Sequence, residues 1–223
     1  MRPGKKTSLQ VIYRRLFRAL GPQRWWPAKT PFEMMVGAIL TQAANWRNVE
    51  QAIARLGQVE GLTPRRLLAM PRSHLERCIR PAGYFRQKGK RLQGFSRWFV
   101  ERYGGSTARM FRTPWRALRE ELLACEGVGP ETADSILLYA LAQPVFVVDA
   151  YTTRIFGRHH LIDRRAAYHD VQRWAMQQLP KRATLYNEFH ALLVAAGKRF
   201  CHRRSPDCEH CPLGDLPHTT EVR

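Results

Sequence analysis

The sequence contains no apolar run that approaches the roughly 20 residues of a membrane-spanning helix. The basic N-terminal segment, MRPGKKTSLQVIYRRLFRAL, has arginines where a signal peptide would carry an uninterrupted apolar core. Low-complexity segments and repeats at a fixed period are absent too. These absences exclude a membrane-spanning class and argue against a signal peptide, and we expect a globular cytoplasmic protein.

Acidic residues are scarce, since 18 Asp and Glu stand against 37 Lys and Arg, and the net charge is +19 over 223 residues. A solvated basic surface is one explanation, and a polyanionic partner is another. We favour nucleic acid over a membrane surface, because no segment combines a Lys-rich face with a broad apolar face.

Strand-like patterns are almost missing. Apolar residues recur at helical spacing nearly throughout, and only VFVV at 145–148 resembles a strand, which we interpret as a buried connector. Ser73 and Glu76 have the spacing of a capping box. The sequence therefore predicts an all-α fold, with helices over about 9–20, 32–43, 45–56, 87–103, 115–125, 131–142, 150–158, 166–179 and 185–200, and shorter helices beginning near 64 and 73.

The stretch CEGVGPETADSILLYA at 125–140 reads as a helix end, a two-glycine turn and a second helix. Glycines allow a tight turn and the close approach of another backbone, and Pro130 suits the first helical position. Amides at such a turn can hold a phosphate, although a glycine cap between two helices would show the same pattern. In a chain of this charge we favour phosphate binding. The expected hairpin contacts are Gly127, Val128, Gly129 and Thr132.

Followed by VFVVDAYTTRIFGR, this hairpin resembles the helix–hairpin–helix DNA glycosylases of the endonuclease III superfamily, in particular the branch that includes 3-methyladenine glycosylases. The segments GAILTQAANWRNVEQAI, AGYFRQKGKRL and NEFHALLVAAGKRFC extend the resemblance over most of residues 30–213. It implies two helical lobes with a DNA-facing cleft between them. Residues 31–144 would form a six-helix barrel with the hairpin, and residues 1–30 and 145–223 a second lobe.

The resemblance places the catalytic carboxylate at Asp149, where an anion stabilises the positive charge that builds on the deoxyribose as the base leaves. The same side chain could cap the helix that starts at Ala150, and both roles are compatible. Bifunctional relatives carry a nucleophilic lysine in the pattern GVGxKTA, but this chain has Glu131 there, and a carboxylate cannot form the imine. We therefore expect a monofunctional glycosylase, with Glu131 facing the base pocket or merely suiting a helix N-terminus.

A glycosylase holds its extruded base between apolar or aromatic surfaces, and Trp25, Trp26 and Trp46 are the candidates unless all three belong to the core. Stacking on Trp favours a cationic, alkylated base. Gln42 resembles the family residue that fills the gap left in the duplex. We expect a monomer that removes alkylated bases from double-stranded DNA in base excision repair, associated with the nucleoid. The alternatives are removal of pyrimidine lesions or mismatched bases, and a catalytically silent DNA-binding paralogue.

Cysteines are few, and three of the five crowd the C-terminal end as Cys201-x6-Cys208-x2-Cys211. This spacing matches the first three ligands of the family's iron–sulfur motif, whose fourth Cys would fall at Pro217. Asp215 and His218 flank that position, and either could supply a non-Cys fourth ligand. We favour a [4Fe–4S] cluster, with zinc or no metal as the alternatives.

Overall fold

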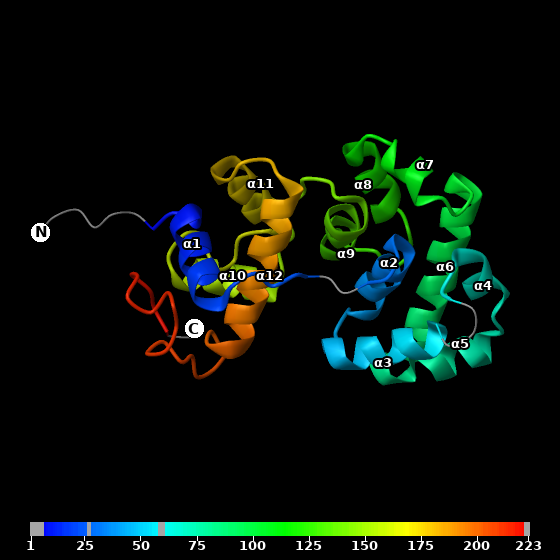
Figure 1. Ribbon diagram of the computed structural model, residues 1–223, viewed down its shortest axis with the longest axis horizontal. Helices are drawn as coiled ribbons and strands as arrows, with labels where there is room; N and C mark the ends of the chain where they lie inside the picture. The colour runs from blue at the N-terminus through cyan, green and yellow to red at the C-terminus, as the bar shows by residue number, and fades with distance from the viewer. Residues whose placement is uncertain (1–6, 26–27, 58–60, 221–223) are drawn as a thin grey trace, which may run out of the picture. The chain divides into compact units, whose positions relative to one another are not determined.

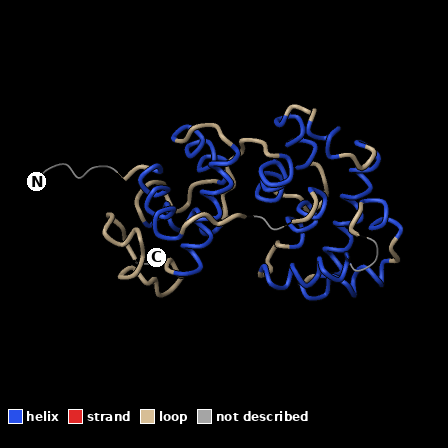
Figure 2. Tube along the Cα trace, in the orientation of Figure 1, coloured by secondary structure: helices blue, strands red, loops and turns tan. Residues whose placement is uncertain are grey.

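The computed structural model describes residues 7–25, 28–57 and 61–220, and within these ranges it shows helices and loops but no strand (Figures 1 and 2). The prediction of an all-α fold is confirmed. The chain divides into two compact units, one of Met1–Trp25 with Pro144–Arg223 and the other of Trp26–Gln143. Among the described residues, no helix has the length and apolar character needed to span a membrane.

The unit Trp26–Gln143 is built around α2 (Pro31–Leu40), in which Phe32 and every residue from Met34 to Leu40 are buried. Thr30 caps this helix by accepting a hydrogen bond from the Glu33 amide at 3.1 Å. Helix α2 contacts α3, α6, α9 and η2. The other helices of this unit are α3 (Trp46–Gly57), α4 (Pro64–Ala69), α5 (Arg72–Ile79), η1 (Arg80–Ala82), α6 (Phe85–Tyr103), α7 (Thr107–Phe111), α8 (Trp115–Leu123), α9 (Pro130–Ser135) and the π-helical turn η2 (Ile136–Ala140).

The second unit packs α1 (Leu9–Leu20) and α10 (Ala150–Arg158) against α12 (Ala183–Arg199), with α11 (Tyr168–Gln178) completing it. Phe146 lies at the centre of its aromatic core, within 5.6–6.4 Å of the rings of Phe156, Tyr186 and Phe189. Residues 145–148 are buried without forming a strand, as predicted, and Gln172 donates to the Phe146 carbonyl oxygen at 2.7 Å.

One local prediction is wrong, and one short helix was missed. The capping box at Ser73 and Glu76 does not form, because α5 begins at Arg72 and its N-cap residue, two residues before Ser73, is Pro71, which makes no side-chain cap. Glu76 instead accepts a hydrogen bond from Arg72 Nε at 2.7 Å. The short helix α7 (Thr107–Phe111) was not predicted, although Ser106 caps it by accepting from the Arg109 amide.

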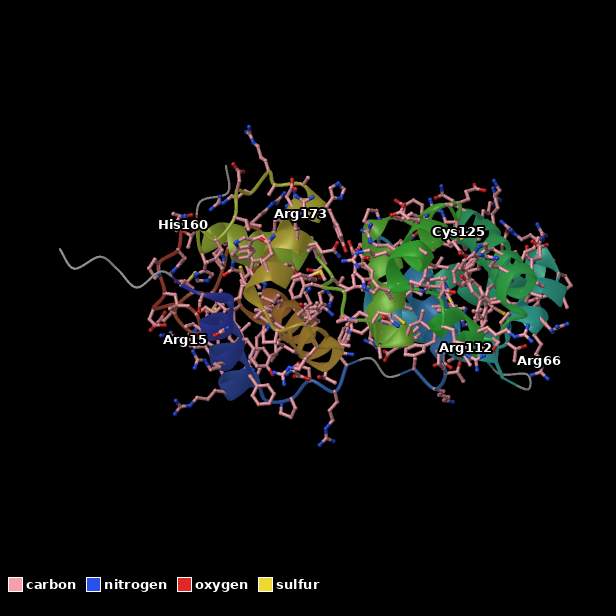
Figure 3. The ribbon with its side chains drawn as sticks, turned by 90° about the horizontal axis from the view of Figure 1, so that it is seen from above. Arg15, Arg66, Arg112, Cys125, His160 and Arg173 are labelled. Atoms are coloured by element: carbon pink, nitrogen blue, oxygen red, sulfur yellow. The ribbon has the colours of Figure 1, made fainter. Side chains whose placement is uncertain are left out.

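Basic side chains extend away from both units. Arg66 and Arg112, in the unit Trp26–Gln143, and Arg173, in the other unit, are all exposed (Figure 3). Exposed arginines on each unit are what the surplus of positive charge predicts for a protein with a polyanionic partner.

Candidate functional site

The turn between α8 and α9 uses its two glycines differently. Gly127 has a φ of 79°, and a Cβ at this position would collide with the side chain of Arg91, so the fold itself requires glycine there. Gly129 has an ordinary φ of −88°, with open space where a Cβ would lie. The folded chain supplies no reason for glycine at 129, whereas a ligand that approaches the backbone closely would supply one.

Helix α9 starts without a side-chain cap. Gly129 is its exposed N-cap residue and has no side chain to accept a capping hydrogen bond, and Pro130 lies in its first turn. The turn closes through a bond of 3.0 Å from the Val128 amide to the Cys125 carbonyl oxygen. Because the side chains of Val128 and Thr132 are buried, any contact that this turn makes with a large ligand comes mainly from its backbone.

Gln42 lies on the hairpin and uses both ends of its side-chain amide. Nε2 donates to the Gly127 carbonyl oxygen at 2.8 Å and to Thr132 Oγ1 at 2.9 Å. Oε1 accepts from Arg91 Nη1 at 2.7 Å. These bonds stabilise the turn, and insertion of Gln42 into a duplex would require them to break. Its predicted role in the duplex stays a prediction.

A buried ion pair joins the two helices of the hairpin. The side chain of Asp134, in α9, is fully buried, and its two carboxylate oxygens accept from Nε and Nη2 of Arg119, in α8, at 2.7 and 3.0 Å. This bidentate geometry fixes both distance and orientation between the helices. The sequence alone did not reveal the pair, because their meeting depends on how α8 packs against α9.

Lys88, in α6, connects two turns of the same unit. Its Nζ donates to the carbonyl oxygens of Leu40 and Ala82, both at 2.8 Å, and the residue is 1% exposed. Burial, and to a smaller degree the charge of Arg91, lowers the pKa of Lys88 to about 8. Even the neutral amine has the two N–H groups that these carbonyls need. Lys88 therefore holds the turn that leads to Gln42 beside the turn that precedes α6.

Tyr84 was also missed by the sequence analysis. It is 69% exposed, has a φ of 44° in the left-handed region, and forms the N-cap of α6. Such a conformation is uncommon for a residue other than glycine, and outliers of this kind cluster at functional sites. No periodic signal in AGYFRQKGKRL distinguishes this aromatic side chain from a buried one.

The remaining predicted pocket residues are distributed over both units. Glu131 is exposed in the first turn of α9, and Trp46 is half-buried at the start of α3. Trp25, in the other unit, is half-buried, and Lys198 Nζ lies 5.8 Å from the centroid of its ring. Trp26 lies outside the described residues. A base pocket formed by these tryptophans stays a prediction.

Asp149 is the N-cap of α10, as the sequence allowed. Its Oδ1 accepts from the Thr152 amide at 2.7 Å, and its Oδ2 lies 3.6 Å from His190 Nε2. Both side chains are largely buried, with 12% and 8% exposed. Burial raises the pKa of the Asp149 carboxyl, but His190 and the Thr152 amide outweigh that effect and lower the pKa below its ordinary value. The carboxylate is therefore a fixed anion at neutral pH.

The same helix holds the C-terminal loop through two arginines. Arg154 donates from Nε to the Cys201 carbonyl oxygen at 2.8 Å. Arg158, only 4% exposed, donates to Cys201 Sγ at 3.0 Å and to the carbonyl oxygens of His202 and Arg203 at 2.7 and 3.0 Å. Helix α10 therefore carries Asp149 at one end and anchors the cysteine segment near the other.

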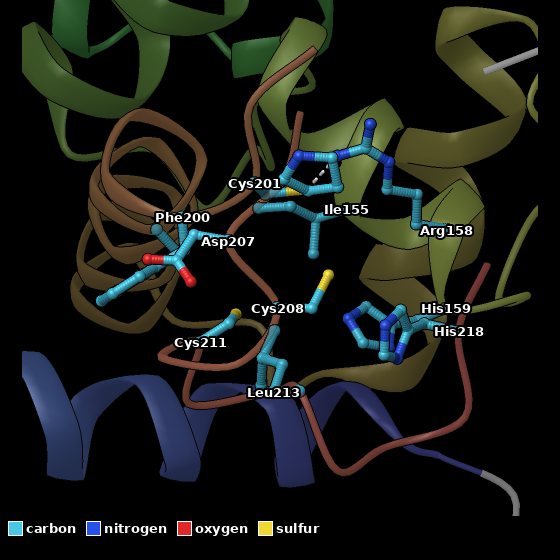
Figure 4. Close-up of a pocket in the computed structure, with 13 residues that line it drawn as sticks. Ile155, Arg158, His159, Phe200, Cys201, Asp207, Cys208, Cys211, Leu213 and His218 are labelled. Atoms are coloured by element: carbon cyan, nitrogen blue, oxygen red, sulfur yellow. Dashed lines mark hydrogen bonds between the residues drawn. The ribbon is translucent and has the colours of Figure 1, made fainter. Parts of the chain in front are cut away.

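Three cysteines line one pocket (Figure 4), which also includes Arg158, His159 and His218. Among the described residues, no three Cys, His, Asp or Glu side chains converge on one point as metal ligands do. The donor set nevertheless suits iron–sulfur chemistry, and the backbone around it is tightly wound. A Cβ at Gly214 would collide with the Cys208 carbonyl oxygen, and the Gly214 amide donates to the Cys211 carbonyl oxygen at 2.8 Å.

Comparison with known proteins identifies the chain. A profile of the HhH-GPD superfamily of base excision DNA repair proteins matches residues 36–181. This chain belongs to that family. A second profile, the iron-sulfur binding domain of endonuclease III, matches residues 201–216, which supports an iron–sulfur cluster in the cysteine loop of this HhH-GPD protein. The resemblance to the endonuclease III superfamily is confirmed, and the HhH-GPD chain is a base excision DNA glycosylase of that superfamily.

Individual relatives cover nearly the whole HhH-GPD chain. A protein of Methanocaldococcus jannaschii with the provisional name of DNA repair glycosylase is 43% identical over 97% of this chain and 98% of its own. Endonuclease III of Thermotoga maritima is 31% identical over 82% and 80%. Among solved structures, the 3-methyladenine DNA glycosylase of H. pylori, bound to 1,N6-ethenoadenine, has a TM-score of 0.76 at 27% identity, over 86% of this chain and 98% of that one. An endonuclease III–DNA complex has a TM-score of 0.80 at 24% identity over 95% of each chain, which shows the fold.

Proposed function

We propose that this glycosylase is monofunctional and hydrolyses the N-glycosidic bond of alkylated bases in duplex DNA, acting as a monomer. The observation that carries the proposal is Glu131, in the first turn of the hairpin helix where bifunctional relatives have an amine. A carboxylate cannot form a Schiff base with the sugar, so water is the nucleophile. Of the lysines near the hairpin, Lys88 is buried and bonded to two carbonyls, and Lys90 forms an ion pair with Glu126.

Asp149 supplies the charge that the chemistry needs. As the bond to the base lengthens, positive charge develops on the deoxyribose, and a fixed anion stabilises it. The lowered pKa of Asp149 keeps its carboxyl ionised, and the cap bond to Thr152 holds it in place. The same carboxylate can orient or deprotonate the attacking water. An alkylated base leaves readily as a neutral molecule, so this chemistry needs little further acid assistance.

Several groups of the unit Trp26–Gln143 suit a duplex with one base extruded. The uncapped start of α9 offers amides to a phosphate, which fixes position without reading sequence. Tyr84 exposes an aromatic ring suited to stacking on bases unpaired by the extrusion, and Lys88 links its turn to that of Gln42. Trp46 of this unit is a proposed surface for the extruded base, where a cationic base gains about 0.5–2 kcal/mol from an indole face.

A lysine at position 131 should give the protein the imine chemistry that it lacks. We expect the wild-type protein and the matched Glu131→Gln variant to give no covalent adduct with DNA that contains an abasic site, after borohydride reduction. Glu131→Lys should give an adduct, because its amine stands where the family's nucleophile stands. Gel mobility of the denatured complex measures the result. An adduct formed by the wild-type protein at the same yield would contradict monofunctional action.

The two glycines of the turn should separate folding from DNA binding. Gly127→Ala forces a strained φ and a collision with Arg91, so we expect a loss of about 1–3 kcal/mol in the free energy of unfolding. Gly129→Ala meets neither obstacle and should leave that free energy unchanged or slightly raised. Its affinity for undamaged duplex should fall about tenfold, a loss of roughly 1.4 kcal/mol.

Thermal unfolding and fluorescence anisotropy with a labelled duplex measure the two effects. Equal affinity of Gly129→Ala and wild type across a salt series would show that the turn does not hold the DNA backbone. Release of pyrimidine lesions or mismatched bases, but not of methylated purines, would favour the alternative substrate class. Binding without release across all these substrates would identify a catalytically silent DNA-binding protein.

A further inference from the structure

The C-terminal cysteine segment lacks a fourth cysteine at the position where the family's iron–sulfur motif has one. Cys201, Cys208 and Cys211 provide three thiols, and the fourth position of the motif falls on Pro217, whose side chain has no donor atom. An iron–sulfur cluster held by three thiolates needs another ligand, which can be an imidazole. The structure distinguishes the two residues that flank the vacant position.

Asp215 is poorly placed to be the fourth ligand. Its side chain is 69% exposed and forms an ion pair with Arg15, on helix α1. It is not among the residues that line the pocket of the three cysteines. A carboxylate is also a hard ligand, less suited than imidazole to a site built from thiolates.

His218 lies on the wall of the cysteine pocket, and Figure 4 shows its ring beside Cys208 and the ring of His159. Its Nδ1 lies 2.8 Å from the Leu216 carbonyl oxygen. A carbonyl oxygen can only accept, so Nδ1 is the donor in this contact, and in the neutral imidazole Nε2 is then the nitrogen that can bind a metal. Metal-ligating histidines typically have this arrangement, in which one nitrogen donates to a backbone carbonyl and the other is the ligand.

His159 is the other imidazole in this pocket, and its contacts suit a residue that positions His218 better than they suit a cluster ligand. It comes from the end of α10, and its Nδ1 lies 3.1 Å from the carbonyl oxygen of Pro217, which it holds as donor. Its ring centroid lies 5.5 Å from that of His218. Both contacts position the segment that carries His218, because they fix the preceding residue and one face of its ring.

We propose that His218, through Nε2, is the fourth ligand of an iron–sulfur cluster whose other ligands are Cys201, Cys208 and Cys211. The assignment is independent of which base the enzyme removes, and it is tested by a readout other than base release. Replacement of a thiolate by a neutral imidazole makes the site less negative, which raises the reduction potential of such clusters. Arg158, which donates to Cys201 Sγ, acts in the same direction.

The test uses the full chain, purified anaerobically, as wild type and as His218→Ala, His218→Cys, His159→Ala and Asp215→Asn. We expect about four iron atoms per chain in the wild type, with nitrogen hyperfine coupling in pulsed EPR of the paramagnetic cluster. His218→Ala should lose at least one iron per chain. His218→Cys should keep the iron, lose the nitrogen coupling and shift the potential downward. Asp215→Asn should match the wild type in both.

Some results would overturn the assignment. These are nitrogen coupling that persists in His218→Cys, coupling that disappears only in His159→Ala, iron loss in Asp215→Asn alone, and wild-type protein that contains zinc or no metal. Because His218→Cys restores the family's donor type, it should remain folded where His218→Ala does not. Circular dichroism and thermal unfolding of each variant separate loss of the ligand from loss of the fold.

Discussion

Replacement of Asp149 by Asn should slow the release of a methylated base by about 10³-fold and leave the affinity for the duplex unchanged. Asn has nearly the shape of Asp and is an equally good N-cap, so its Oδ1 can still accept from the Thr152 amide and α10 keeps its start. The substitution removes the negative charge that stabilises the developing sugar cation. The expected loss is therefore in the chemical step.

Single-turnover release of base from a duplex with one methylated purine measures this rate, and anisotropy measures binding. His190→Gln is the informative companion, because it removes the imidazole 3.6 Å from Oδ2 and leaves the carboxylate. We expect it to slow release less than Asp149→Asn and to raise the pH at which activity is lost on acidification. If Asp149→Asn released the base at the wild-type rate, Asp149 would act only as the N-cap of α10 and not in catalysis.

Asp134→Asn should destabilise the protein by about 3–5 kcal/mol, because it leaves Arg119 without its carboxylate in a place with little access to water. The side chain of Asp134 is fully buried and that of Arg119 is 17% exposed, so solvent cannot replace the lost bonds. Since the pair joins α8 to α9, the loss should also reduce DNA binding through the hairpin.

The matched control is the double variant Arg119→Met with Asp134→Leu. Replacement of a whole buried pair by apolar side chains of similar volume is often neutral, so the double variant should recover most of the lost free energy of unfolding. Denaturant unfolding of the three proteins gives the result. A single variant as stable as the wild type would show that this ion pair does not brace the hairpin.

The features that the sequence predicted correctly depend on neighbours along the chain. The cap at Asp149 and the bounds of α10 follow from a short polar residue before a helical run, and the prediction of Ala150 to Arg158 matches the structure. The two-glycine turn and Pro130 were recognisable for the same reason. The predicted cap at Ser73 was wrong, because the N-cap residue of α5 is Pro71, two residues earlier.

The features that the sequence missed depend on packing between distant segments. Lys88 reaches Leu40 across 48 positions, and Arg91 reaches Gln42 across 49, so no local pattern predicts either contact. The difference between Gly127 and Gly129 also needed three dimensions, because it depends on the left-handed φ of Gly127 and on the side chain of Arg91 beside it. The sequence left both Asp215 and His218 open as the fourth ligand for the same reason. In the folded chain Asp215 forms an ion pair with the distant Arg15, which favours His218.

Helix α10 carries Asp149, the proposed catalytic carboxylate, at its N-terminus, and its residues Arg154 and Arg158 hold the cysteine segment. Oxidative damage to those thiols should weaken the contacts of Arg154 and Arg158 and displace Asp149. Protein without iron would then lose base release because its structure has changed. Inactivity of such a preparation would not be evidence that electrons take part in bond cleavage. Comparisons of the enzyme with and without iron should therefore include amide hydrogen exchange along residues 150–158, which reports whether α10 is equally stable in the two preparations.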